Sequence, residues 1–89
     1  MITVWKYEIE NSDTQIIVPT GAFPLYIAKQ FDKLCIWCRV DSEEAESQNL
    51  IILIRGTGRP IPDGVHYLGS FQEEGGIFVF HVFWKVEAA

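Results

Sequence analysis

Two cysteines, Cys35 and Cys38, have the Cys-x-x-Cys spacing of thioredoxin-type redox sites. In those sites the first cysteine stands at a helix N-terminus, where the helix dipole lowers the pKa of its thiol. Here the flanking run, Leu34-Cys35-Ile36-Trp37-Cys38, is typical of a strand. Side chains three positions apart in a strand point to opposite faces, so we expect the two sulfurs to diverge and the cysteines to act as small buried hydrophobes.

The same cysteines together with His66 and His81 supply the two-cysteine, two-histidine set that a structural zinc ion requires. A zinc knuckle presents its cysteines on a tight turn and its histidines at close spacing, and this sequence has neither feature. We therefore predict no metal site. His81 lies within an aromatic run and is expected to be a hydrogen-bonded structural histidine, whereas His66 follows a turn and is expected to be exposed.

Cysteine and histidine can also form a nucleophile with its base, but no spacing in the chain favours such a pair. A chain of 89 residues rarely provides both a hydrophobic core and a deep pocket. The sequence therefore predicts no catalytic residues, no cofactor and no enzymatic activity.

A glycine-rich segment flanked by arginines, residues 55–59, could hold a phosphate. Glycines let backbone N–H groups approach an anion, and arginines can grip its oxygens. The segment lacks the further glycine and the lysine of nucleotide-binding loops, and no helix follows it, so a shaped structural turn is the favoured interpretation. The candidate residues for binding a ligand or partner in this region are Arg55, Thr57, Arg59, Asp63, His66 and Tyr67.

Residues 41–49 form an acidic stretch in which Asp41 could cap a helix and Glu44 could reach back toward it. The stretch has no apolar face to bury, so an exposed acidic loop with at most one helical turn is expected. Such a loop could attract a basic patch on a partner protein. Its candidate partner-binding residues are Glu43, Glu44 and Glu46.

Strands are the elements that must position these residues. Alternating or β-branched apolar runs predict strands at residues 3–9, 15–18, 25–29, 33–40, 50–54, 66–71 and 77–85. Turn-forming residues at 10–13 predict a first hairpin, the break at 30–32 a second, and residues 73–76 a third. Three glycines and two prolines make residues 56–64 an irregular loop.

The pattern predicts one all-β domain spanning residues 1–89, a small antiparallel β-sandwich or partly open barrel of about six to seven strands, largely consecutive hairpins. The runs 34–38 and 77–85 are apolar on both faces, which indicates central strands covered on both sides or strands that meet another subunit. We therefore expect a homo-oligomer and favour a dimer.

The composition narrows the class of partner. Hydrophobic residues make up 48% of the chain, which favours a folded domain over a disordered one. Seven basic and twelve acidic residues give a net charge of -5, which disfavours direct binding of nucleic acid. No apolar run is long enough to span a membrane and the first residues do not resemble a signal peptide, so a cytoplasmic protein is expected.

An ordered set of segments resembles an uncharacterised family of small proteins from tailed bacteriophages and prophages. The resemblance extends over nearly the whole chain and is carried by Trp5-Lys6-Tyr7, Gly56-Thr57-Gly58-Arg59-Pro60-Ile61-Pro62, Tyr67-Leu68-Gly69-Ser70-Phe71 and Gly75-Gly76-Ile77-Phe78-Val79-Phe80-His81-Val82-Phe83. It implies expression inside a bacterial host and no activity that can be transferred.

Three functions are consistent with this sequence. The first is a phage accessory protein that occupies a bacterial host protein, as an inhibitor or counter-defence factor, through the 56–64 loop together with the acidic stretch. The second is an oligomer that sequesters a phosphorylated or nucleotide signalling molecule through Arg55 and Arg59. The third is a minor virion or assembly component whose doubly apolar strands make subunit contacts.

Overall fold

Seven strands and one short 3₁₀ turn make up the regular structure of the computed structural model, which describes residues 1–10 and 12–89. The strands are β1 (Ile2–Ile9), β2 (Thr14–Pro19), β3 (Phe23–Gln30), β4 (Lys33–Asp41), β5 (Ser47–Gly56), β6 (His66–Glu73) and β7 (Phe78–Ala88), and the turn is η1 (Glu74–Gly76). The described residues form no helix with the length and hydropathy needed to cross a lipid bilayer. Every strand that the sequence predicts is present.

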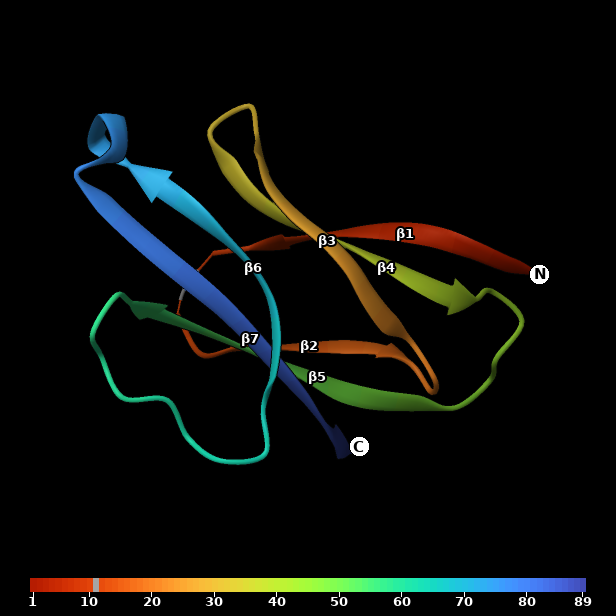
Figure 1. The fold of residues 1–89 in the computed structure, drawn as a ribbon. Coiled ribbons are helices and arrows are strands. Elements are labelled where there is room, and N and C mark those ends of the chain that lie inside the picture. Colours follow the sequence, from red (N-terminus) through yellow and green to blue (C-terminus); the bar gives the residue numbers. More distant parts are fainter. Residues whose placement is uncertain (11) are drawn as a thin grey trace.

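The strands form two antiparallel sheets that stack as a sandwich (Figure 1). One sheet has three strands in the order β1-β4-β3, and the other has four in the order β2-β5-β7-β6. The sheets do not close into a barrel, so the sandwich form of the predicted all-β fold is confirmed and the barrel form is wrong.

Two of the expected hairpins are present and one is not. β3 and β4 pair through the tight turn at residues 31–32, and β6 and β7 pair around η1. The hairpin expected across residues 10–13 is wrong, because β1 pairs with β4 whereas β2 pairs with β5 in the other sheet. β1 and β2 thus form an arch between the two layers. Asn11, part of that expected turn, lies outside the described residues.

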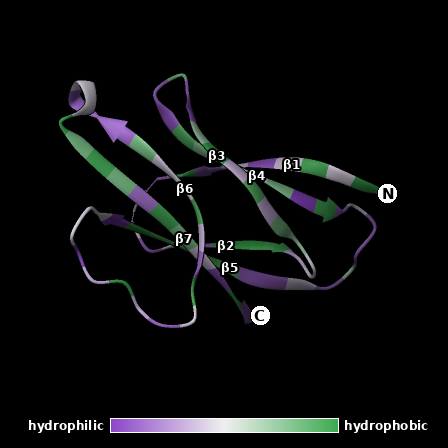
Figure 2. Ribbon diagram, viewed as in Figure 1, coloured by the Kyte–Doolittle hydropathy of each residue, from purple (hydrophilic) through white to green (hydrophobic). Residues whose placement is uncertain are grey.

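The core lies between the inner faces of the two sheets. Its members are apolar side chains at alternate positions along each strand, which matches the period of two expected for strands buried on one face. Figure 2 shows apolar residues along the strands and hydrophilic residues in the loop between β4 and β5. The fully buried side chains of the core are Val18, Ile36, Cys38, Val40, Leu50, Ile52 and Val82.

β4 and β7, the two strands that are apolar on both faces, are inner strands of their sheets. This agrees with the expectation of central strands. In β7 the residues Phe80, Val82 and Trp84 face the core, and the residues between them lie on the outer face of the sheet. Trp84 packs edge-on against Phe23 of β3, with ring centroids 5.3 Å apart. The alternation predicted for residues 77–85 is therefore confirmed.

The two sheets approach each other closely where β3 lies beside β6. Gly69 faces the side chain of Ile27, and a Cβ atom added at Gly69 would lie only 2.8 Å from the Cγ2 atom of Ile27. Ile27 is buried and its β-branched side chain has little freedom to rotate away. A residue without a side chain is therefore required at this contact.

Gly69→Ala is expected to lower the free energy of unfolding by about 1–3 kcal/mol, because overpacking forces the backbone or a rigid side chain to shift. Gly56→Ala is the matched control, since a Cβ there would lie 3.8 Å from its nearest neighbour, Phe80. Urea denaturation of both variants measures the difference. Equal stability of the two variants would contradict the proposed close contact.

Candidate binding site

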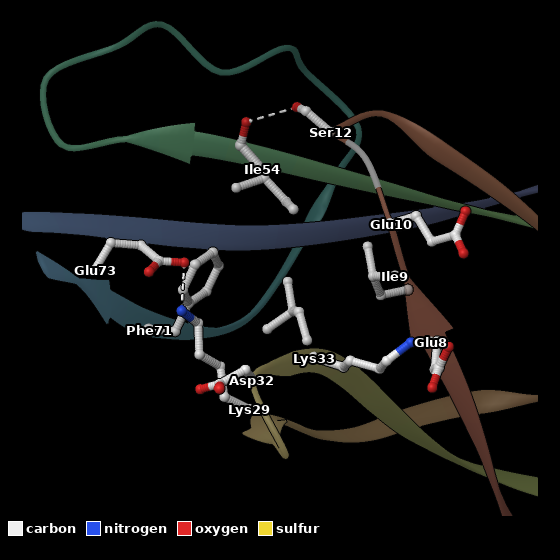
Figure 3. A pocket seen from close by; sticks show the side chains of 11 residues that line it. Glu8, Ile9, Glu10, Ser12, Lys29, Asp32, Lys33, Ile54, Phe71 and Glu73 are labelled. Atoms are coloured by element: carbon white, nitrogen blue, oxygen red, sulfur yellow. Dashed lines mark hydrogen bonds and ion pairs between the residues drawn. The ribbon is translucent and has the colours of Figure 1, made fainter.

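A cleft of about 390 Å³ opens at one end of the sandwich, between the end of β1, the β3–β4 turn and the end of β6 (Figure 3). Four apolar side chains line it, one from each of β1, β4, β5 and β6: Ile9, Leu34, Ile54 and Phe71. Ser12 donates a hydrogen bond to the Ile54 carbonyl at 3.2 Å and so ties the crossing after β1 to β5. The cleft is thus an exposed extension of the core.

Charged side chains surround this apolar lining. Four carboxylates and two ammonium groups give the lining a net charge of -2, and they belong to Glu8, Glu10, Asp32, Glu73, Lys29 and Lys33. The acidic excess has the same sign as the net charge of the whole chain, -5. The cleft therefore favours a cationic group over an anionic one.

Both lysines of the cleft already have acidic partners. Lys29 forms an ion pair with Glu73, and its Nζ atom lies 5.8 Å from the centroid of the Phe71 ring (Figure 3). Lys33 Nζ lies 3.7 Å from a carboxylate oxygen of Glu8. Among the described residues, no hydrogen bond or ion pair is made by the side chains of Glu10 and Asp32. These two carboxylates are the ones available to a partner.

Phe31 stands at the tip of the β3–β4 hairpin, next to the cleft, and is 91% exposed. Phe31 and Asp32 both have positive φ angles, 51° and 65°, as a two-residue type I′ turn requires. Asparagine and glycine suit these positions, whereas a bulky aromatic residue is strained there. An exposed aromatic ring on a strained backbone contributes little to folding, so we interpret Phe31 as a contact residue.

The sequence-predicted ligand residues divide between different surfaces. Three of them, Arg55, Thr57 and Tyr67, lie near His81: Arg55 is its cross-strand neighbour in the β5–β7 pair, and Thr57 and Tyr67 contact its ring. The Thr57 hydroxyl lies 2.8 Å from His81 Nε2, and the Tyr67 hydroxyl lies 3.5 Å from His81 Nδ1. The Thr57 hydroxyl also lies 3.3 Å from the Val79 carbonyl oxygen, to which it can donate a hydrogen bond. His81 is thus hydrogen-bonded, as expected.

Arg55 is already bound within the protein. Its guanidinium donates to both carboxylate oxygens of Asp13, at 2.7 and 3.5 Å, and to the carbonyl of Ile54 at 3.0 Å. The same contact holds the pKa of the Asp13 carboxyl below its usual value. A phosphate would have to displace this carboxylate, so the geometry does not support a phosphate site built on Arg55.

The other three predicted ligand residues lie apart from this group. His66 is exposed, as expected, and packs on Trp84 with ring centroids 4.6 Å apart, on the opposite face of the sheet from Tyr67. Arg59 lines a second cleft of about 390 Å³ beside Gly56 and the start of β7, and Asp63 is exposed in the loop. The six residues therefore do not form a single site.

Of the acidic loop predicted at residues 41–49, residues 42–46 lie outside the strands, at the opposite end of β4 from the cleft, and residues 43–46 are exposed. Glu43 accepts a 2.8 Å hydrogen bond from the amino group of Met1, and this bond raises the pKa of that amino group. Glu44 accepts from the backbone N–H of Glu46 at 3.1 Å. Two of the three glutamates thus also fix the shape of their own loop.

Cys35 and Cys38 are free thiols buried in the structure, as the strand interpretation predicted. Burial raises the pKa of Cys38 to about 11, so its thiolate is scarce at neutral pH. Within residues 1–10 and 12–89, no three side chains of His, Cys, Asp or Glu converge as a metal site would require.

The sequence does not predict the cleft, because its lining comes from strands β1, β3, β4, β5 and β6 and from residues next to them, which lie far apart in the chain. The only local sequence feature that indicates the cleft is Phe31, an apolar residue in an otherwise polar turn. Neither the spacing of Glu10 and Asp32 nor that of Ile54 and Phe71 indicates that these residues meet.

A family model described as Domain of unknown function (DUF7352) matches residues 1–89, which is the whole of this sequence. The chain belongs to this family. The match confirms the expectation that this protein belongs to an uncharacterised family. No curated protein and no solved structure shows significant similarity to this member of the DUF7352 family.

Phe31→Asn is expected to raise the free energy of unfolding by about 0.5–1 kcal/mol, because asparagine tolerates the left-handed backbone better than phenylalanine does. Phe31→Ala is the matched control, since it removes the ring and keeps the strain. Urea denaturation compares the two variants with the unaltered protein. An Asn variant that is no more stable than the Ala variant would show that the turn is not strained.

Asp13→Asn is expected to lower stability by under about 1 kcal/mol at neutral pH, because its ion pair with Arg55 is partly exposed. The pKa of Asp13 is depressed in the folded state, so this contribution is present above the ordinary pKa of 3.8 and disappears as the pH falls through the folded-state pKa. Denaturation at neutral pH and below pH 3 measures it. A difference between variant and parent that persists unchanged in acid would contradict the ion-pair assignment.

Proposed function

We propose that this DUF7352 protein is a non-catalytic binding protein whose cleft takes a basic side chain from a protein partner. The observation that supports it is the combination of an apolar cleft, an acidic excess around it and a strained, exposed aromatic residue beside it. The resemblance to phage and prophage proteins suggests the setting: a bacterial host protein as target, bound in the host cytoplasm to inhibit it or to counter a defence.

The size and lining of the cleft suit one long cationic side chain. A volume of about 390 Å³ is near the lower end of the range for small-ligand sites. The methylene stem of a lysine or arginine can pack against apolar residues while its charged head stays near acidic groups. Glu10 and Asp32 would receive the head, and Phe31 would contact the partner surface around it.

The charges of the chain also favour a basic partner. Electrostatic attraction between a protein of net charge -5 and a basic partner surface increases the association rate and helps to orient the two proteins as they meet. Because Lys29 and Lys33 are tied to Glu73 and Glu8, they reduce the acidic excess at the cleft without abolishing it.

Two alternatives have less support. Sequestration of a phosphorylated or nucleotide signalling molecule would rest on Arg55 and Arg59, and Arg55 is bound to Asp13. A minor virion or assembly component would use the outer faces of the sheets, where Ile17 and Tyr26 are exposed. Thermal stabilisation by cyclic or linear nucleotides would favour the first alternative, and recovery of the protein from purified particles the second.

The test compares capture of partners from a bacterial lysate by the parent protein and by a variant with both free carboxylates reversed, Glu10→Lys with Asp32→Lys. The matched control reverses two carboxylates of the distant acidic loop, Glu44→Lys with Glu46→Lys. We expect one specific protein to be captured by the parent and by the control, and its recovery to fall at least about tenfold with the cleft variant.

Phe31→Asn provides a second measurement, because this variant is expected to be at least as stable as the parent protein. Loss of the captured partner in this variant therefore cannot be attributed to unfolding. A partner that is retained by the cleft variant and lost by the loop variant would move the site to the acidic loop. Failure to capture any specific protein at every salt concentration would overturn the proposal.

A further inference from the structure

The four edge strands of the sandwich differ in how well they could accept another strand. β2 has only six residues and ends at Pro19. β3 contains Pro24 and an irregularity at Leu25, and β6 has one at Leu68, next to Gly69. Short strands, prolines, bulges and charged side chains are features that prevent edge strands from pairing with other chains.

β1 is neither short nor interrupted by a proline or a bulge, and its two charges, Lys6 and Glu8, are of opposite sign. It pairs with β4 over eight consecutive residues with no shift of register, and it contains neither proline nor glycine. Among the described residues, none forms a strand beyond it in the three-stranded sheet (Figure 1). Ile2 and Val4 are about half exposed along it. The edge is thus long, regular and accessible.

The hydrogen bonds to β4 determine which residues of β1 face outward. The backbone N–H of Ser42 donates to the carbonyl of Met1 at 2.9 Å, so the odd-numbered residues of β1 direct their N–H and C=O groups at β4. The residues whose backbone groups point away from the protein are therefore Ile2, Val4, Lys6 and Glu8.

We propose that β1 pairs in antiparallel fashion with β1 of a second copy, which joins two three-stranded sheets into a continuous sheet of six strands. Because the outward groups belong to even-numbered residues, two copies can form hydrogen bonds only in registers that pair even-numbered with even-numbered residues. This condition leaves few arrangements.

Charge selects among them. A register centred on Tyr7 places Lys6 opposite Glu8 twice, once on each side of the axis. A register centred on Lys6 places two lysines opposite each other, and one centred on Trp5 gives neither charge an opposite partner. Opposite charges stabilise directly facing positions and like charges destabilise them, so the Tyr7 register is favoured. The strand carries both members of its own ion pair, which identifies a second copy as the occupant.

Charge exchange at these two positions tests the pairing. We expect the parent protein to dimerise in sedimentation equilibrium, and Lys6→Glu and Glu8→Lys each to raise the dimer dissociation constant at least about tenfold. The variant carrying both changes restores two opposite-charge pairs and should return to within about threefold of the parent protein. Thermal denaturation of each variant checks that the fold is retained.

Lys85→Glu is the matched control, because it reverses one charge on β7 in the other sheet. It should leave the dissociation constant unchanged. Loss of the dimer in this variant would place the contact on the four-stranded sheet and overturn the proposal. A parent protein that remains monomeric at millimolar concentration, or a dimer that persists in both single variants, would also overturn it.

Hydrogen exchange provides an independent readout of the same register. The amides of Lys6 and Glu8 should become protected only as the protein concentration rises, whereas those of Trp5 and Tyr7, which bond to β4, should be protected at every concentration. Edge pairing would be contradicted if the protection of both sets of amides depended on protein concentration, or if the protection of neither set did. Phe31→Asn should not change this pattern, so failure of the cleft proposal and failure of the dimer proposal can be distinguished.

Discussion

Apolar packing between the two sheets is the interaction on which the rest of the structure depends. Ile36 and Val40 of β4 lie in one fully buried cluster with Leu50 and Ile52 of β5 and Val82 of β7. These are the inner strands of their sheets. Because consecutive strands are divided between the two sheets, the chain crosses between the layers after β1, β2 and β4. The crossings leave open ends and exposed edges. The cleft and the β1 edge are therefore consequences of how the core is assembled.

The positions and inward faces of the strands could be predicted from the sequence, whereas their pairing could only partly be predicted. Alternation along residues 3–9 and 77–85 identifies the side chains that enter the core, because the period of a strand is fixed by backbone geometry. It does not identify the neighbour that accepts the hydrogen bonds. Turn residues at 10–13 suit a hairpin within one sheet and an arch between two sheets equally well, which is why the expected first hairpin was wrong.

The candidate site was the least predictable part. Residues 56–64 were predicted as a binding region from their glycines and prolines, which shape the loop, and from the arginines Arg55 and Arg59. The structure binds Arg55 to Asp13, 42 positions away, and no local pattern could reveal that this charge is already neutralised. The cleft could not be predicted because its lining includes ordinary apolar residues such as Ile54 and Phe71. These residues become a binding surface only where the two layers separate.

β1 connects the two proposed surfaces through Glu8. Its carboxylate lies beside Lys33 at the cleft, and in the proposed dimer it also faces Lys6 of the second copy. A carboxylate has two oxygens and can accept from both ammonium groups, so the two contacts do not compete. Dimer formation would then restrict Glu8 and the neighbouring Glu10 before a partner arrives, which reduces the entropy lost on binding. Because such coupling is reciprocal, a partner in the cleft would strengthen the dimer by the same factor.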